Sequence, residues 1–309
     1  MTFSVYGTGA VGAYYGGRLA ERGNTVHFLA RSDYRQIKEK GIKVNSPRGD
    51  FHLETPSVFQ DARRMPPSDV LLISLKTTAN KGLREHLMTL VHEKTALVIL
   101  QNGLGMEEEF QSWFPDNPIL GGMCFICARK KEPAVFEHLD YGLITLGTLD
   151  KKERPLRDRI GKLMEEAGIP VTLVEDLKEA RWRKLLWNIP YNGLSVTLNC
   201  NTKAMMENRY SRKIIETLMM EVLEGAATCG CPIGKKAVEK MLHFTEKMTP
   251  YEPSMKLDYL SGRPMEIEYM YDRPLQAASD RGCTMKGVSL LRDQLKYIQE
   301  QYSKLKPGQ

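Results

Sequence analysis

Lys184, Asn188 and Asn192 recur at intervals of four in the stretch RWRKLLWNIPYNGLSVTLN, residues 181–199. In an α-helix, four residues advance a side chain by only about 40°, so these three polar groups share one face. An ammonium beside amides could stabilise a carbonyl oxygen that gains negative charge during a reaction. Pro190 lies between the two asparagines, where it removes a helical hydrogen bond and usually bends the helix. The stretch alone predicts either the wall of a binding site or a solvated outer face.

A glycine-rich loop lies near the N-terminus, in the stretch VYGTGAVGAYYGG. Its glycines have the G-x-G-x-x-G spacing, and they follow a strand pattern and open a helical one. Such glycines permit a tight turn, a close approach of a pyrophosphate to the backbone, and packing of the helix on the strand. The free N–H groups at the helix start then face the phosphates. We therefore predict a dinucleotide site formed by Gly7, Thr8, Gly9, Ala10, Val11 and Gly12.

The end of the next predicted strand distinguishes between nicotinamide cofactors. NAD sites usually place an Asp or Glu there, about 20 residues after the loop, to bind the ribose hydroxyls. This chain instead has Arg31 followed by Ser32, which fit the 2′-phosphate of NADPH. Asp33 is a counterargument, although it lies past the strand end. The residues favour NADPH.

Two later strand ends also carry polar residues. Lys76 emerges from the apolar stretch DVLLISLK, and Asn102 ends the stretch TALVILQN. Ligands of open α/β sheets bind at the carboxyl ends of the strands, so both residues are candidates for contact with the cofactor. The alternatives are a solvated loop lysine and a turn-forming Asn-Gly pair.

These residues require a parallel sheet to position them. Residues 69–76 and 95–102 are almost continuously apolar, as strands covered on both faces are. Helical stretches alternate with strands, at 10–23, 83–94, 106–114 and within 155–176. Residues 134–148 alternate as a hairpin does, and would close the sheet with an antiparallel pairing. The fold class is therefore α/β, with an N-terminal Rossmann-type doubly wound sheet.

From about residue 178 the strand patterns nearly vanish and the chain becomes mainly α-helical. We expect a NADP-binding domain over residues 1–175 and a helical substrate and catalytic domain over residues 176–309. The predicted helical segments are 178–199, 207–230, 234–247, 254–261, 264–281 and 285–306.

Composition excludes several other classes of function. The net charge of +6 is spread over mixed charges without a basic block, so we expect no nucleic-acid partner. No apolar run reaches the roughly 18 to 20 residues of a membrane span, and no secretion signal precedes the first strand. The sequence CFIC is extended, and its cysteines would point to opposite faces, so no metal is expected. We predict a cytoplasmic protein with reduced thiols.

The order of these features resembles the ketopantoate reductase (2-dehydropantoate 2-reductase) family over nearly the whole chain. The resemblance is carried by the glycine loop, the lysine after the fourth strand, the NG-G loop, the WRKL--N---N helix and a late EI-Y segment. It implies NADPH-dependent reduction of ketopantoate, a small keto acid, to pantoate, as in pantothenate and coenzyme A biosynthesis.

The resemblance also implies roles for individual residues. Lys184 would polarise the keto oxygen and supply the proton, and Asn102 would lie by the nicotinamide and Lys184. Glu266, preferred over Glu268, would hold the hydroxyl end of the substrate. The other implied contacts are Asn188 and Asn192 in the substrate pocket, Ser254 at the substrate carboxylate, and Lys76 near the cofactor.

The chain departs from the family pattern at four positions. Tyr271 and Asp272 stand where Asn-Gly is usual, Thr202 follows Asn201 where a further pocket asparagine is common, and Pro190 interrupts the lysine helix. A different small 2-keto acid therefore remains an alternative substrate, and a non-catalytic NADPH sensor remains an alternative function. A sensor would need only the glycine loop, so the lysine and glutamate favour an enzyme. The sequence is compatible with a homodimer but does not establish one.

Overall fold

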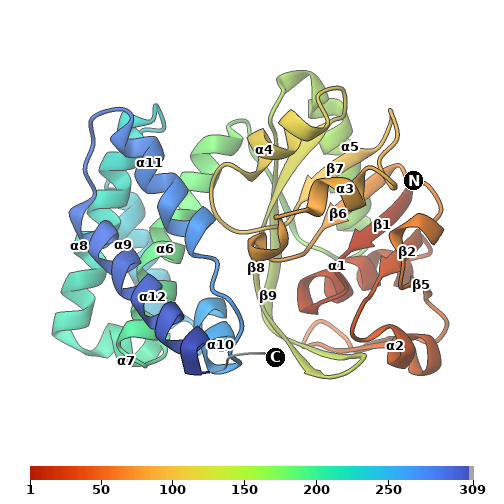
Figure 1. Cartoon of the computed structure of the whole chain (residues 1–309), viewed down its shortest axis with the longest axis horizontal. Coiled ribbons are helices and arrows are strands. Elements are labelled where there is room, and N and C mark those ends of the chain that lie inside the picture. The colour runs from red at the N-terminus through yellow and green to blue at the C-terminus, as the bar shows by residue number, and fades with distance from the viewer. Residues whose placement is uncertain (306–309) are drawn as a thin grey trace. The chain divides into compact units, whose positions relative to one another are not determined.

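The computed structural model describes residues 1–305, with side chains as far as residue 301. The chain forms two compact units, the first consisting of Met1–Gln101 and Met106–Leu177. The second consists of Asn102–Gly105 and Lys178–Gln309 (Figure 1). The loop Asn102–Gly105 therefore belongs to the helical unit, although the residues on both sides of it in the sequence belong to the first unit.

Within residues 1–305, the first unit contains one ten-stranded mixed sheet with the order β4-β3-β9-β8-β7-β6-β1-β2-β5, and β10 pairs with β9. The strands are β1 (Thr2–Tyr6), β2 (Thr25–Leu29), β3 (Ile42–Asn45), β4 (Phe51–Leu53), β5 (Ser57–Phe59), β6 (Val70–Ile73), β7 (Ala96–Ile99), β8 (Ile119–Glu132), β9 (Val135–Thr148) and β10 (Val171–Leu173).

The central strands confirm the predicted parallel core. β1 pairs in parallel with β2 and with β6, and β6 pairs in parallel with β7. Every residue of β6 and β7 is buried, as their continuous apolar patterns require. Of residues 134–148, Val135–Thr148 form the single strand β9 rather than a hairpin of their own, and the predicted antiparallel pairing is made with β8.

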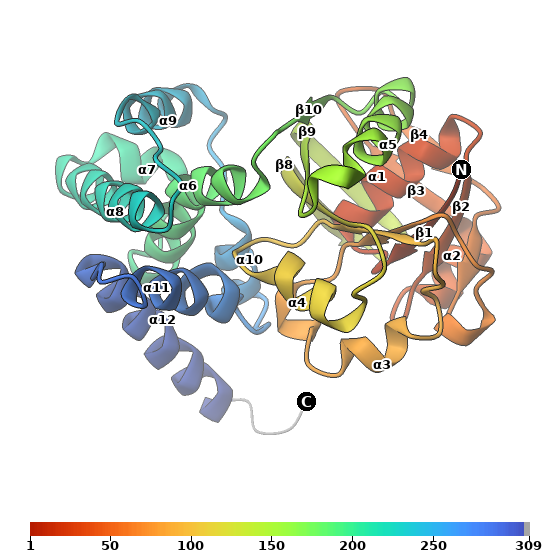
Figure 2. The same cartoon turned by 90° about the horizontal axis from the view of Figure 1, so that it is seen from above.

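Helices cover both faces of this sheet. Figure 2 shows α1 (Ala10–Glu21) and α5 (Arg154–Glu166) on one face, and α3 (Leu83–Leu87) and α4 (Met106–Trp113) on the other. α1 packs closely because its glycines leave room: a Cβ at Gly16 would lie 2.5 Å from Val5. The first unit also contains α2 (Tyr34–Lys40) and the 3₁₀ turns η1 (Ala62–Arg64), η2 (Thr77–Ala79) and η3 (Lys151–Glu153).

The helix predicted at 83–94 extends only over Leu83–Leu87. Beyond it, side-chain hydroxyls compete for backbone groups that a helix would use. The Thr89 hydroxyl donates to the His86 carbonyl, and the His92 N–H donates to the Thr95 hydroxyl. Such local bonds offer the backbone an alternative to the helix, which accounts for its early end.

A buried arginine ties α1 to the chain segment before β4. The Arg18 guanidinium donates to the Ser46 hydroxyl at 3.2 Å and to the carbonyls of Arg48 and Gly49. The same guanidinium lies 4.6 Å from the ring centroid of Phe51. The buried guanidinium thus makes charge-assisted hydrogen bonds to a hydroxyl and two backbone carbonyls.

His138 on β9 completes this cluster and is only 2% exposed. Its ring lies 4.3 Å from that of Tyr14, and its Nε2 lies 3.0 Å from the Asp140 carbonyl. A carbonyl only accepts, so Nε2 carries the proton and Nδ1 accepts from the Ser46 hydroxyl at 2.8 Å. Burial lowers the pKa of His138, and the positive charge of Arg48 and Arg18 lowers it further.

This environment predicts a pH dependence of stability. Because the pKa of His138 is lowered by folding, the unfolded chain binds more protons in acid than the folded chain does. The free energy of unfolding should therefore decrease as the pH falls below the ordinary histidine pKa of about 6.5. His138→Gln should flatten this decrease in urea unfolding measured from neutral to mildly acidic pH. His243→Gln, at an exposed histidine, is the control, and equal pH slopes for wild type and His138→Gln would contradict the prediction.

The second unit is helical, and among the described residues no helix is long and apolar enough to cross a membrane. Its elements are α6 (Leu177–Thr197), α7 (Thr202–Glu207), α8 (Arg209–Thr228), α9 (Lys236–Lys247), α10 (Ser254–Leu260), the π-helical turn η4 (Glu268–Asp272), α11 (Arg273–Ser279) and α12 (Lys286–Leu305). The short helix α7 was not predicted. It begins where the Asn201 side chain accepts a hydrogen bond from the Ala204 N–H at 3.0 Å.

The helix α6 forms the centre of this unit. Every residue from Leu185 to Val196 is buried, and the helix continues through Pro190. The Tyr271 hydroxyl donates to the carbonyl of Ile189 at 2.8 Å. It also packs against Gly193, where a Cβ would lie 2.6 Å from its oxygen. Pro190 and Tyr271, two of the residues that depart from the family pattern, therefore lie in one packed region of the core.

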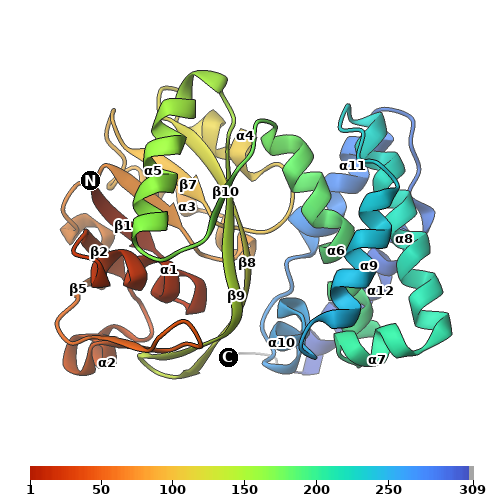
Figure 3. The ribbon, with the colours of Figure 1, turned by 180° about the vertical axis from the view of Figure 1, so that it is seen from behind.

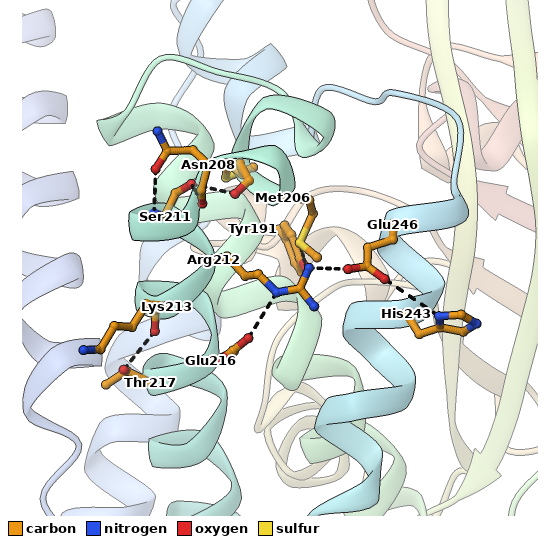
Figure 4. Close-up of polar contacts among 11 residues, drawn as sticks. Tyr191, Met206, Asn208, Ser211, Arg212, Lys213, Glu216, Thr217, His243 and Glu246 are labelled. Atoms are coloured by element: carbon orange, nitrogen blue, oxygen red, sulfur yellow. Dashed lines mark hydrogen bonds and ion pairs between the residues drawn. The ribbon is translucent and has the colours of Figure 1, made fainter.

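The neighbouring helices α8 and α9 run side by side (Figures 1 and 3). Figure 4 shows Arg212 of α8 between Glu216 on its own helix and Glu246 on α9. The guanidinium holds the pKa of Glu246 below its usual range. These ion pairs are solvent-exposed and contribute little stability, so the apolar core carries most of the packing energy.

Candidate functional site

Lys184 and Asn102 meet although 82 residues separate them in the sequence. The Lys184 ammonium donates to the Asn102 side-chain oxygen at 2.7 Å. Lys184 is half-buried, whereas Asn188 and Asn192, on the same face of α6, are 6% and 2% exposed. The polar stripe of α6 is therefore not a solvated outer face.

The loop that carries Asn102 requires glycine. Gly103 has φ +112°, and a Cβ there would lie 2.5 Å from the Tyr269 carbonyl oxygen. The same carbonyl accepts the Leu104 N–H at 2.9 Å. Asn102 and Gly103 thus form a turn, which was the alternative to a cofactor contact in the sequence analysis. This turn also brings Asn102 to Lys184.

The two candidate glutamates differ sharply in environment. Glu266 is 5% exposed, whereas the Glu268 side chain is 63% exposed and pairs with Arg273 at 3.1 Å. The π-helical turn η4 begins at Glu268, two residues after Glu266. Single π-helical turns are frequent at functional sites. Burial favours Glu266 as the carboxylate with a specific task, because a buried carboxylate is costly unless it is partnered.

The structure also brings Asn192 and Ser254 together. The Asn192 side-chain oxygen accepts the Met255 N–H at 3.1 Å and lies 3.4 Å from the donating Ser254 hydroxyl. The central helix therefore holds the start of α10 through an amide beyond Pro190. The direction of Asn192 is set by these two bonds.

In the first unit, the three glycines of the loop have different surroundings. A Cβ at Gly7, which has φ +106°, would lie 2.7 Å from the Leu75 side chain, and one at Gly12 would lie 2.3 Å from the Gly7 carbonyl. At Gly9, by contrast, a Cβ would meet no atom of the described residues within 4 Å. Gly9 stands at the N-cap of α1, where helix N–H groups lack intrahelical partners. This open space and these donors fit a pyrophosphate group.

The residues after β2 present a cation and a hydroxyl to solvent. Arg31 and Ser32 are exposed, whereas Asp33 is buried. One Asp33 oxygen accepts from the Ser32 hydroxyl at 2.8 Å and from the Lys130 ammonium at 2.9 Å. One oxygen of the carboxylate that could have served a ribose is therefore engaged with a lysine of β8, whereas its other oxygen has no hydrogen-bond partner among the described residues.

Sequence reasoning missed a buried amide pair beside Lys76. Lys76 is half-buried and stands directly before η2. The Asn80 and Gln101 side chains donate to each other, at 3.3 Å and 2.7 Å, so the segments after β6 and β7 are joined. Gln101 directly precedes Asn102. A polar residue at the end of a buried strand is the sequence feature from which this amide pair could have been predicted. Within the described residues, no group of three or more His, Cys, Asp or Glu side chains is placed to hold a metal.

A glycine loop on a Rossmann-type sheet, followed by a helical unit that bears a lysine bonded to an amide, defines a nicotinamide-dependent oxidoreductase. The family model for "Ketopantoate reductase PanE/ApbA" matches residues 3–151, and the model for its C-terminal region matches residues 176–299. A 2-dehydropantoate 2-reductase of Nostoc sp. is 42% identical over 301 residues, which cover 96% of this chain and 94% of that protein. The chain belongs to the ketopantoate reductase family.

Solved structures agree with this assignment. The 2-dehydropantoate 2-reductase of Geobacter metallireducens is 37% identical, with a TM-score of 0.92 over 97% of this chain and 99% of that one. A D-mandelate dehydrogenase solved with NADH and anilino(oxo)acetate has a TM-score of 0.90 over 98% of this chain and 100% of that one. At 20% identity, the latter shows a shared fold.

The contrast between Gly9 and Gly12 gives a test of the glycine loop. Gly9→Ala should leave thermal unfolding nearly unchanged but weaken dinucleotide binding at least about tenfold, because the new methyl group enters the space beside the phosphates. Gly12→Ala should destabilise the fold by about 1–3 kcal/mol through overpacking. Fluorescence titration with NADPH and thermal unfolding measure the two effects. Binding by Gly9→Ala that equals wild type would place the phosphates elsewhere.

Proposed function

We propose that this protein reduces 2-dehydropantoate to pantoate with NADPH in the cytoplasm, a step of pantothenate and coenzyme A synthesis. The contact between the Lys184 ammonium and the Asn102 amide is the observation that carries the proposal. In this proposal, residues 1–175 bind the cofactor and residues 176–309 provide the substrate and catalytic groups. Membership in a family of NAD(P)-dependent reductases supports the reaction class.

Lys184 is proposed as the group that acts on the ketone. The bound cofactor supplies a hydride to the carbonyl carbon, and the oxygen then develops alkoxide character. An ammonium beside that oxygen stabilises the transition state more than the ground state, and it donates the proton that completes the alcohol. Asn102 orients the ammonium through a neutral oxygen, so it does not cancel the positive charge.

The remaining polar groups of the second unit fit the other ends of the substrate. Glu266 would repel the substrate carboxylate, so we assign it to the hydroxyl end, where a carboxylate can accept a hydrogen bond. Ser254 is assigned to the substrate carboxylate, and Asn188 and Asn192 to the walls of the substrate site. Amides and a hydroxyl can hold these oxygens without adding a competing charge.

The positions at which the chain departs from the usual family pattern have structural partners. Burial raises the pKa of the Tyr271 hydroxyl, which keeps its proton and donates to α6. Asp272 pairs with Arg292 at 3.0 Å and with Lys296 at 2.9 Å. Thr202 exchanges hydrogen bonds with the backbone of Tyr251. These roles in packing account for the departures without requiring a different substrate.

NADPH is proposed over NADH because Arg31 and Ser32 are exposed after β2 while Asp33 is paired with Lys130. A guanidinium suits a 2′-phosphate, with which it forms two parallel hydrogen bonds. The loop residues from Gly7 to Gly12 would hold the pyrophosphate. Lys76 and Asn102 would lie nearer the nicotinamide.

Removal of the ammonium tests the reaction. Lys184→Ala should lower kcat for ketopantoate about 10²–10⁴-fold, the usual contribution of a positioned general acid. The KM for NADPH should change little, because the phosphates are bound by other residues. NADPH oxidation is followed with a panel of 2-keto acids that includes ketopantoate. NADPH binding by the wild-type protein without turnover of any panel member would instead favour a sensor.

Removal of the guanidinium tests the cofactor. Arg31→Ala should reduce the preference for NADPH over NADH about 10–100-fold in kcat/KM, because a charge-assisted contact to a phosphate is lost. The kcat at saturating NADPH should stay close to that of the wild type. Arg35→Ala, at an exposed arginine of α2, is the matched control. A wild-type preference for NADH would contradict the assignment.

A further inference from the structure

The segment that follows Glu266 holds the loop that carries Asn102. We propose that Arg273 is a positioning residue that fixes the loop Asn102–Gly105 on the second unit and thereby keeps Asn102 bonded to Lys184. The role rests on the proposed function only in that the Lys184 and Asn102 pair is taken to act on the ketone. The contacts themselves are independent of the substrate.

Arg273, the first residue of α11, contacts the end of the loop directly. Its Nη1 donates to the Gly105 carbonyl at 2.9 Å. Its guanidinium also lies over the ring of Tyr269, 3.7 Å from the centroid. Tyr269 in turn accepts the Leu104 N–H at 2.9 Å. One side chain and the residue on which it stacks thus bind two consecutive residues of the loop.

A third contact orients the guanidinium. Its Nε and Nη2 both donate to one oxygen of Glu268, at 3.3 Å and 3.1 Å. Glu268 and Tyr269 lie in the π-helical turn, and Arg273 directly follows it. A planar guanidinium with several fixed donors can stack and donate in two directions at once, which a lysine cannot.

The position of the loop in the chain makes such an anchor necessary. Both flanking segments, which end at Gln101 and begin again at Met106, belong to the first unit. Asn102 is held beside Lys184 by contacts within the second unit, whereas its covalent neighbour Gln101 belongs to the first. The Gly105 carbonyl is the last acceptor of the loop before the chain returns to the first unit. Its hydrogen bond to Arg273 is therefore the last contact that holds the loop on the second unit.

Kinetics separate this role from a purely structural one. Arg273→Ala should lower kcat about 10–100-fold while the KM for NADPH stays within about twofold, since loss of precise positioning costs rate rather than cofactor binding. Arg273→Lys should recover only part of the rate. Arg281→Ala is the matched control, because Arg281 also donates to a carbonyl, but to that of Ala277, which lies outside the loop Asn102–Gly105.

A double-mutant cycle with Asn102→Ala identifies the residue through which Arg273 acts. If Arg273 works by placing Asn102, the double variant should lose no more activity than Asn102→Ala alone, and the separate losses should not multiply. Fully multiplying losses would overturn the proposal. Thermal unfolding of each variant excludes a global loss of structure, and Arg273→Lys serves where Arg273→Ala does not fold.

Hydrogen exchange provides a readout that needs no turnover. The Leu104 amide, bonded to the Tyr269 carbonyl, should exchange at least about tenfold faster in Arg273→Ala than in wild type, and it should be unchanged in Arg281→Ala. Unchanged exchange in Arg273→Ala would overturn the proposed anchor whatever the substrate. Faster exchange in a protein that reduces no keto acid would refute the proposed reaction and leave the anchor intact.

Discussion

The site depends on a single interaction, the hydrogen bond that the Lys184 ammonium on the largely buried helix α6 donates to the Asn102 amide oxygen. Burial penalises a charged lysine unless a hydrogen-bond acceptor replaces water. The amide oxygen of Asn102 satisfies the ammonium without opposing charge. The turn at Gly103 brings that amide to the lysine. The bonds of Leu104 and Gly105 to Tyr269 and Arg273 hold this turn in place.

The rigidity of the central helix gives this pair its geometry. α6 is buried around its whole circumference from Leu185 to Val196, so packing decides where each side chain points. Trp187 stacks on Tyr191 at 4.9 Å, and the Tyr271 hydroxyl supports the turn that contains Pro190. A helix packed in this way cannot rotate its polar face, and it continues through Pro190.

Local patterns predicted the fold better than they predicted the site. The parallel strands, the glycine loop and the positions of most helices follow from periodicity and spacing, which neighbouring residues determine. The membership of the Asn102 loop in the helical unit does not, because it depends on Tyr269 and Arg273, far along the chain. The π-helical turn and the amide pair of Asn80 and Gln101 likewise arise from tertiary contacts. The burial of Glu266 also results from packing and could not be predicted from a sequence motif.

The bond between Gly105 and Arg273 spans 168 residues of sequence, and this separation has a consequence for biosynthesis. During translation, the strands of the first unit can pair long before residue 273 leaves the ribosome. The loop between two of those strands, however, lacks its bond to Arg273 until then. Contacts of such high sequence separation form late and slow the last stage of folding. A nascent chain therefore assembles the sheet of its first unit first, and it completes the surroundings of Lys184 only after residue 273 has emerged.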